Sequence, residues 1–160
     1  MRVRKYQMRD TDVMMSIWNG VVEEGNAFPQ EKPLDATTGD AFFASQSYCG
    51  VAVDFGANVH GLYILHPNNE GRCGHIANAS FAVAPSSRGQ NVGEDLVKDC
   101  LVQAARLGFK ILQFNAVVAD NEPARKLYEK LGFKQLGTIP GGFRLNDGSY
   151  ADICLYYIEL

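Results

Sequence analysis

Strand-like and helix-like segments alternate along residues 75–139, and this alternation restricts the fold more than any other feature of the sequence. Apolar stretches at His75–Val83, Ile111–Val118 and Phe133–Ile139 are typical of strands. Between them lie two segments with apolar residues at helical spacing, the first beginning at Val92 and the second following Asn121. Strands that alternate with helices favour one sheet covered by helices. The sequence therefore predicts an α/β (α+β) fold.

The rest of the chain supplies further elements of the same domain. We expect a strand at Val3–Met8, a helix from Asp10 or Thr11 to Gly25, a weaker helix over Asp35–Gln46, and a last strand at Tyr150–Ile158. The first helix presents one apolar stripe, made of Val13, Met14, Ile17, Trp18, Val21 and Val22. Strands at Cys49–Phe55 and Val59–Leu65 are close enough for a hairpin. Since no repeat, linker or low-complexity segment interrupts the chain, we expect residues 1–160 to form a single domain.

Composition excludes several classes of protein. With 160 residues, of which 46% are hydrophobic and 21% charged, the chain can bury a core, and disorder is excluded for most of it. No apolar run approaches the roughly 20 residues of a membrane span. The net charge of −3 argues against a nucleic-acid partner. The four cysteines lack metal-site spacing and no export signal precedes the chain, so we expect buried cysteines, no metal and a cytoplasmic location.

The segment Pro85–Gly93, between a strand and a helix, has the composition of an anion-binding loop. Backbone N–H groups at such a turn, together with the helix dipole, favour a bound anion. Gly89 and Gly93 allow close approach of a ligand, and Arg88 offers a charged contact. Neither the Walker A nor the Rossmann spacing is present. An ordinary strand-to-helix turn is therefore an equal interpretation of the loop alone.

A second motif, Asn121–Phe133, decides between these interpretations. It reads N-x-x-A-R-x-L-Y-x-x-x-G-F, and it follows R-G-x-x-x-G and a strand. In this combination and element order the chain resembles the GNAT N-acetyltransferase superfamily. The resemblance implies a GNAT fold, whose central sheet splays between the fourth and fifth strands. It also implies acetyl-CoA as cosubstrate.

The resemblance assigns the cofactor contacts residue by residue. The backbone N–H groups of Arg88, Gly89, Gln90, Asn91, Val92 and Gly93 would bind the pyrophosphate, while Phe81 and Val83 would flank the pantetheine arm. Asn121 matches an asparagine that contacts the cofactor, and it can also cap a helix. Arg125 would approach the phosphates. Asn91 replaces the first motif glycine, and we expect weaker cofactor binding because its side chain adds bulk.

Tyr128 occupies the superfamily's position for the general acid. The thiolate that leaves during acetyl transfer needs a proton or a hydrogen bond, which a phenol can supply. Helical periodicity alone would make Tyr128 a core residue beside Leu127 and Leu131.

Two branches of the superfamily resemble the chain most. The stretch Glu24–Phe28 is similar to the acceptor-lining segment of phosphinothricin or methionine-sulfone N-acetyltransferases, which implies that Phe28 contacts the acceptor. That branch places a glutamate base in the fourth strand, where this chain has Asn78, and an amide cannot take the proton.

The fungal proline-analogue N-acetyltransferase resembles the chain at this position. Its fourth strand carries an asparagine where this chain has Asn78, and its fifth strand matches Phe114–Asn115 followed by Asn121. The match implies a small amino or imino acid as acceptor, with Asn78 and Asn115 at the acceptor and the thioester. Alternatively, both asparagines satisfy backbone groups where the strands part.

Several assignments stay open. The general base is Glu23, Glu24, His75 or a water chain, and Arg144 either binds an acceptor carboxylate or lies in an exposed turn. Acetylation of peptides or proteins, and a sensor domain that binds coenzyme A without turnover, are alternative functions. Many relatives form dimers, so a homodimer is a further expectation from the resemblance.

Overall fold

The computed structural model describes all of residues 1–160 and has one sheet of seven strands in the order β1-β2-β3-β4-β5-β7-β6. The strands are β1 (Arg2–Lys5), β2 (Tyr48–Val53), β3 (Val59–Pro67), β4 (Ile76–Val83), β5 (Ile111–Val118), β6 (Lys134–Arg144) and β7 (Tyr150–Glu159). The helices are α1 (Thr11–Glu24), α2 (Ala36–Ala44), α3 (Val92–Arg106) and α4 (Glu122–Lys130).

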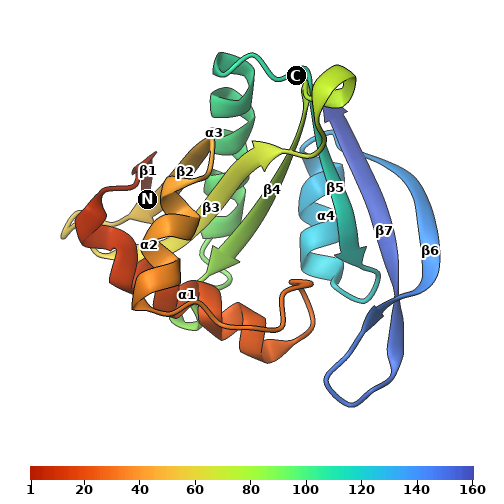
Figure 1. The fold of residues 1–160 in the computed structure, drawn as a ribbon, viewed down its shortest axis with the longest axis horizontal. Coiled ribbons are helices and arrows are strands. Elements are labelled where there is room, and N and C mark those ends of the chain that lie inside the picture. Colours follow the sequence, from red (N-terminus) through yellow and green to blue (C-terminus); the bar gives the residue numbers. More distant parts are fainter.

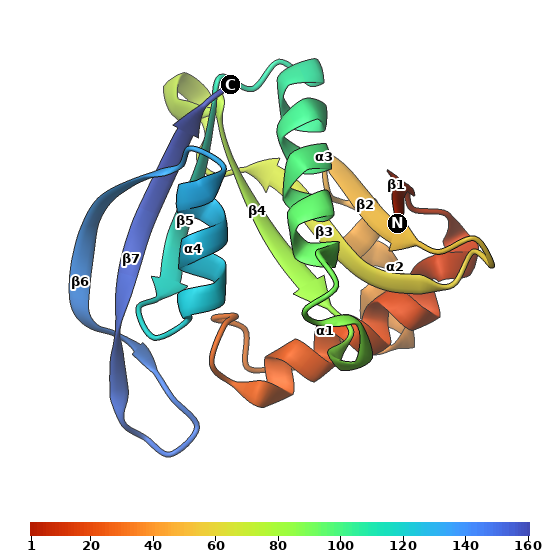
Figure 2. The ribbon, with the colours of Figure 1, turned by 180° about the vertical axis from the view of Figure 1, so that it is seen from behind.

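Helices cover both faces of the sheet. The helices α1 and α2 lie on the face seen in Figure 1, and α3 and α4 lie on the face seen in Figure 2. Each face has its own core, one containing Trp18, Phe43 and Leu62, the other containing Leu96, Leu112 and Tyr156. The mixed α/β architecture predicted from the alternation is confirmed.

The sheet opens between β4 and β5. These neighbours run parallel, and they pair only at their first residues, Ile76 with Ile111 and Ala77 with Leu112. Beyond this point the strands diverge (Figure 1). Every other neighbouring pair is antiparallel. The predicted splay between the fourth and fifth strands is therefore present, and its open side lies at the carboxyl ends of both strands.

The first strand and helix differ from expectation in two details. The strand ends at Lys5 because the chain turns to let Asp10 accept hydrogen bonds from Arg4 Nη1 (2.7 Å) and from the Gln7 N–H (2.7 Å). In α1, Val13 is 45% exposed, so the apolar stripe is narrower than predicted. The helix does end at Gly25, which adopts the left-handed conformation that favours glycine (φ 66°).

The C-terminal hairpin is longer than its sequence suggests. The strand β6 runs on to Arg144, through Pro140 and two glycines that the sequence analysis placed in the loop. It can do so because its pairing with β7 is interrupted between Ile139 and Phe143. The register shifts there, and residues 140–142 form a bulge in β6. Arg144 therefore lies at a strand end and not in a turn.

Three further findings concern the cysteines, possible metal ligands and possible membrane spans. Cys49, Cys100 and Cys154 are buried as expected, whereas Cys73 is exposed because it lies in the short turn Gly71–Cys73 before β4. No group of histidine, cysteine or acidic side chains is arranged to hold a metal ion. None of the helices combines the length and the apolar character needed to cross a membrane.

Candidate active site

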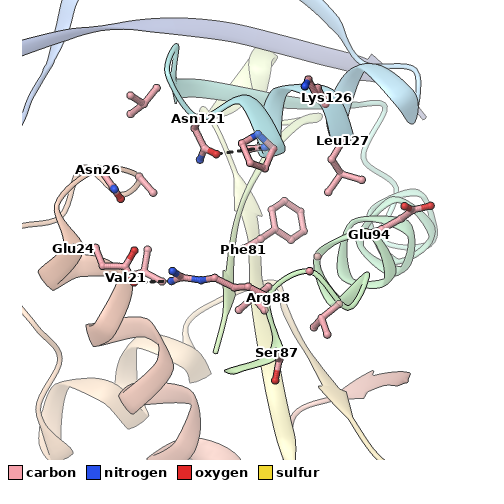
Figure 3. Close-up of a pocket in the computed structure, with 18 of the residues that line it drawn as sticks. Val21, Glu24, Asn26, Phe81, Ser87, Arg88, Glu94, Asn121, Lys126 and Leu127 are labelled. Atoms are coloured by element: carbon pink, nitrogen blue, oxygen red, sulfur yellow. Dashed lines mark hydrogen bonds and ion pairs between the residues drawn. The ribbon is translucent and has the colours of Figure 1, made fainter. Parts of the chain in front are cut away.

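A cleft of about 940 Å³ lies on the open side of the splayed strands. Its walls are Phe81 and Val83 on β4, Val118 at the end of β5, and residues from the ends of α1, α3 and α4. Figure 3 shows Phe81 at the centre, Asn121 on one side and Glu94 on the other. An elongated ligand can enter here because no strand fills the space between β4 and β5.

The predicted phosphate loop, residues 85–93, forms one edge of this cleft. Gly89 and Asn91 both have positive φ, 77° and 63°, so successive backbone groups turn before α3 begins at Val92. Glycine adopts such angles freely and asparagine tolerates them, which agrees with the expected survival of the turn. The Asn91 side chain makes no capping hydrogen bond. The first N–H groups of α3 are therefore free for an anion.

Most of the predicted cofactor residues line the cleft. Phe81, Val83, Arg88, Gly89, Asn91, Val92, Gly93 and Asn121 all do so. Asn121 also caps α4, since its Oδ1 accepts a hydrogen bond from the Ala124 N–H (3.4 Å). Gln90 and Arg125 are not among the residues that line the cleft. The Gln90 side chain donates back to the Ser86 carbonyl (3.1 Å), whereas the contact predicted for this residue is through its backbone N–H.

Arg125 instead joins α4 to the C-terminal strands. Its Nε donates to the Tyr156 hydroxyl (3.0 Å) and its Nη1 donates to the Ala119 carbonyl (3.1 Å). The cations that do line the cleft from α4 are Lys126 and Lys130. One helical turn separates these two lysines, which places them on one face of α4, whereas Arg125 lies on another.

Two ion pairs span the cleft. Arg88 of the phosphate loop donates to Glu24 at the end of α1 (2.6 Å), as Figure 3 shows. Glu94 in the first turn of α3 receives Lys130 from α4 (2.7 Å) and Lys98 (2.8 Å). Hydrogen bonds from Lys130 and Lys98 lower the pKa of Glu94 to about 2, so its carboxylate is charged at neutral pH. In both pairs a carboxylate neutralises a positive group, Arg88 or Lys130, that would otherwise face an anionic ligand.

Tyr128 lies among aromatic rings behind the wall of the cleft. Its ring centroid is 4.5 Å from that of Phe114, 5.5 Å from that of Phe133 and 6.0 Å from that of Tyr156. Burial raises the pKa of Tyr128 well above its usual range, which keeps the phenol protonated. The Tyr156 hydroxyl pairs with Arg125 and Glu129, whereas no protein group bonds to the Tyr128 hydroxyl. A protonated hydroxyl without a partner can donate to a ligand.

Asn78 and Asn115 meet through a third asparagine. The Oδ1 of Asn68, in the turn between β3 and β4, accepts from Asn78 Nδ2 (3.1 Å) and from Asn115 Nδ2 (2.6 Å). Their neighbours Ala77, Ala79, Leu112 and Phe114 belong to the core under α3 and α4. Alternation along a strand therefore places both asparagines on the opposite face. Asn68, Asn78 and Asn115, called the amide cluster below, thus bridge β4 and β5.

The amide cluster has a histidine beside it that the sequence analysis did not consider. His66 on β3 stands directly opposite Asn78 in the antiparallel pairing, so the two side chains share a face. Its Nδ1 lies 2.9 Å from the Pro67 carbonyl, which can only accept, so Nδ1 carries the hydrogen. In the neutral ring Nε2 is then free to accept a proton. Only the pairing register could have identified this residue.

None of the three side chains that the sequence left open as bases is hydrogen-bonded to the amide cluster. His75 precedes β4 and is exposed, and its carbonyl accepts from Lys110 and Ile111 at the closed end of the splay. Glu24 is engaged by Arg88. Glu23 is exposed at the last turn of α1.

Phe28 and Arg144 come together in a second cavity of about 460 Å³, between the segment after α1 and the end of β6. Phe28 is buried against Trp18, with ring centroids 4.4 Å apart, and shapes the wall. Arg144 forms an ion pair with Glu31 of the same cavity. Leu145 lines both cavities, so they adjoin each other.

The family follows from comparison with known proteins. The family described as "Acetyltransferase (GNAT) family" matches residues 15–133, which is most of the chain. This chain belongs to the GNAT acetyltransferase family. A solved GNAT, a GCN5-related N-acetyltransferase from Kribbella flavida, is 32% identical and has a TM-score of 0.92, covering 99% of this chain and 97% of that one. The splay and the loop described above thus belong to a fold that this N-acetyltransferase shares.

Two other GNAT relatives are similar over different lengths. N-acetyltransferase aca1 from Schizosaccharomyces pombe is 37% identical over 106 residues, which is 66% of this chain and 51% of the relative. The chain thus spans about half the length of that relative. A phosphinothricin acetyltransferase from Sinorhizobium meliloti, solved in complex with AcCoA, shares the fold at 19% identity, with a TM-score of 0.92 over 99% of this chain and 88% of that one.

Proposed function

We propose that this GNAT N-acetyltransferase uses acetyl-CoA to acetylate the amine of a small amino or imino acid or an analogue, by direct attack in a ternary complex. The amide cluster carries the proposal. It joins β4 to β5 where the two strands begin to part, next to the gap in which the thioester would sit. Amides can orient both a carboxylate and an amine, through N–H and C=O respectively.

The cleft supports acetyl-CoA as the donor. A narrow apolar wall of Phe81 and Val83 suits the pantetheine arm, and the phosphate loop suits the pyrophosphate. Lys126 adds positive charge at the α4 side. Because the cleft opens where β4 is unpaired, the free edge of β4 can hydrogen-bond to the amides of the arm.

Tyr128 is proposed as the general acid. The amine nitrogen attacks the thioester carbonyl carbon, and the C–N bond forms as a tetrahedral intermediate appears. The C–S bond then breaks, and the thiolate of coenzyme A takes the phenolic proton. A raised pKa suits this task because it keeps Tyr128 protonated until the thiolate develops.

His66 is proposed as the general base. The attacking amine must be neutral, and histidine can take up a proton near neutral pH. His66 lies beside the amide cluster, with Nε2 free in the neutral ring. An acceptor held by Asn78 and Asn115 would therefore have a proton acceptor next to it. This assignment explains how the site can work with an asparagine in place of a strand glutamate.

Arg144 and Phe28 are proposed to complete the acceptor site. Arg144 offers a guanidinium to a carboxylate, provided that the acceptor displaces Glu31. Phe28 closes the adjoining wall and restricts the site to small acceptors.

Substitution of the asparagines tests the acceptor assignment. With azetidine-2-carboxylate as acceptor, Asn78→Ala and Asn115→Ala should each raise the KM for the acceptor about tenfold, because each removes a hydrogen bond to the ligand. The KM for acetyl-CoA should stay unchanged. Asn69→Ala is the matched control, since Asn69 is exposed beside Asn68 in the same turn.

Substitution of His66 tests the base. His66→Gln should lower kcat/KM, while His75→Gln leaves it unchanged. Equal KM values in the two asparagine variants and the control would contradict the acceptor assignment. Turnover of a lysine peptide alone would favour a protein acetyltransferase, and binding of coenzyme A without any turnover would favour a sensor.

A further inference from the structure

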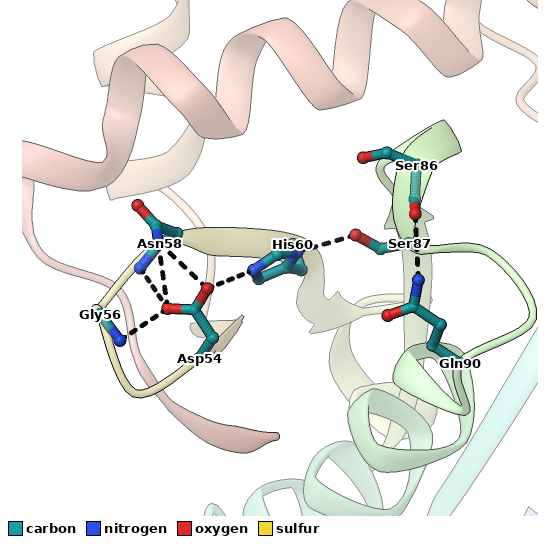
Figure 4. Close-up of polar contacts among 7 residues, drawn as sticks. All are labelled: Asp54, Gly56, Asn58, His60, Ser86, Ser87 and Gln90. Carbon is teal, nitrogen blue, oxygen red and sulfur yellow. Dashed lines mark hydrogen bonds and ion pairs between the residues drawn. The ribbon is translucent and has the colours of Figure 1, made fainter.

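Asp54, His60 and Ser87 form a chain of hydrogen bonds that none of the steps above uses. The His60 Nε2 lies 2.9 Å from Asp54 Oδ2, and its Nδ1 lies 2.7 Å from Ser87 Oγ (Figure 4). Asp54 and His60 flank the turn between β2 and β3, whereas Ser87 belongs to the phosphate loop. These hydrogen bonds thus connect the β2–β3 hairpin to the phosphate loop at the edge of the cleft.

The chemistry of the partners fixes the direction of these hydrogen bonds. The carboxylate of Asp54 can only accept, so His60 Nε2 carries a hydrogen. In the neutral ring Nδ1 is then the acceptor, and the Ser87 hydroxyl donates to it. The pKa of Asp54 lies below its usual range, chiefly because of the His60 bond, so the carboxylate stays charged.

Asp54 is itself held in place by its own turn. It accepts from the Gly56 N–H (2.8 Å) and from the Asn58 N–H (3.0 Å), as well as from the Asn58 side chain. The Asp54 end of this series of hydrogen bonds is therefore fixed to the β2–β3 hairpin. His60 adds a backbone contact, because its carbonyl accepts from the Ala84 N–H (2.9 Å) just before the loop.

The phosphate loop needs such a support. Gly89 and Asn91 adopt positive φ, and no side chain caps the start of α3. The other hydrogen bonds of residues 85–90 join the Ser87 and Arg88 N–H groups to the carbonyls of Ala84 and Pro85, Gln90 to Ser86, and the exposed Arg88 to Glu24. Ser87 is only 2% exposed, so its hydroxyl is the buried anchor of the segment.

A serine, a histidine and an aspartate in series also suggest a hydrolytic triad. The burial of Ser87 argues against this role, because the residue lies at the wall of the cleft but only 2% of it is exposed to an acyl carbonyl. The arrangement therefore acts on the position of the loop and not on a substrate.

We propose that His60, held by Asp54, is a positioning residue that fixes Ser87 and so preforms the phosphate loop for acetyl-CoA. This inference rests on the proposed function, since it takes the loop as the cofactor site. The predicted consequence is selective. Loss of the Asp54–His60–Ser87 hydrogen bonds should weaken cofactor binding without changing the acceptor site or the chemical step.

The test compares Ser87→Ala with Ser86→Ala by titration of coenzyme A. Ser86 is the exposed neighbour, and its side chain makes no hydrogen bond to the protein. Ser87→Ala should raise the Kd for coenzyme A about fivefold, as expected for one lost hydrogen bond. The KM for acetyl-CoA should rise in parallel, while kcat and the KM for the acceptor stay constant. Ser86→Ala should bind as the wild type does.

Two further variants keep the proposal testable if Ser87→Ala does not fold. Asp54→Asn should raise the Kd and accelerate amide exchange of residues 85–93, whereas Asn58→Ala should do so much less because it leaves His60 and Ser87 in contact. Unchanged Kd and exchange in Asp54→Asn would overturn the proposal. A wild-type protein that does not bind coenzyme A would overturn the proposed function instead, and with it this inference.

Discussion

Replacing Tyr128 by phenylalanine removes one hydroxyl from the aromatic cluster beside the cleft. The ring itself is held by Phe114, Phe133 and Tyr156 at centroid distances of 4.5, 5.5 and 6.0 Å, and phenylalanine can fill the same space. No protein group loses a partner, because none bonds to the Tyr128 hydroxyl. Stability should therefore change by less than about 1 kcal/mol.

The effect on turnover should be much larger than the effect on folding. A positioned general acid contributes about 10²–10⁴-fold, so we expect kcat to fall at least about 100-fold, which corresponds to about 2.7 kcal/mol in the barrier. The Kd for coenzyme A should stay within about twofold of the wild type, since the hydroxyl acts on the leaving thiolate. Release of free thiol, followed continuously with a thiol reagent, measures kcat, and calorimetric titration measures the Kd.

Tyr156→Phe provides the matched control. That hydroxyl bonds to Arg125 and Glu129, so its loss should lower stability, with kcat in the folded protein nearly unchanged. Tyr128→Phe with kcat within twofold of the wild type would refute the role of Tyr128 as acid. A similar loss of kcat in both variants would show that the aromatic cluster matters only for structure.

Three other substitutions test separate parts of the account. Asn91→Gly should lower the Kd for coenzyme A several-fold in calorimetric titration, because glycine adopts φ of 63° without strain and removes a side chain from the loop. Glu24→Gln frees Arg88 and should strengthen coenzyme A binding by about two- to threefold at low salt, with a smaller gain at high salt, since the pair is exposed. Asp10→Ala leaves the Arg4 guanidinium without its buried partner and should cost about 3 kcal/mol in chemical denaturation. Since Arg4 lowers the Asp10 pKa, the stabilisation from this pair is present above the ordinary aspartate range and is lost as the pH falls through the lowered pKa.

The sequence predicts the parts of the site that depend on local signals. The turn at residues 85–93 follows from its glycines and the helix behind it, and Asn121 is recognisable as the cap of α4. The end of α1 at Gly25 is equally local. Each of these features is set by residues within a few positions of one another, which is why composition and spacing suffice.

The contacts that complete the site join distant segments and have no local signal. Asn68 and Asn115 are 47 positions apart, and Arg88 is 64 positions from Glu24. Arg125 looks like a cofactor contact in the motif, yet its guanidinium is turned toward the Tyr156 hydroxyl on β7. Periodicity includes Val13 in the apolar stripe of α1, yet Val13 is 45% exposed in the folded protein. Contacts between residues so far apart in the sequence can be identified only from the three-dimensional structure.

Release of coenzyme A from acetyl-CoA across a panel of amines tests the central claim most directly. The panel comprises azetidine-2-carboxylate, proline analogues, phosphinothricin, methionine sulfone, polyamines and a lysine peptide, with the acetylated product identified by its mass. We predict turnover with an amino or imino acid that depends on Tyr128, Asn78 and Asn115. Turnover confined to the lysine peptide, or binding of coenzyme A with no turnover of any amine, would contradict it.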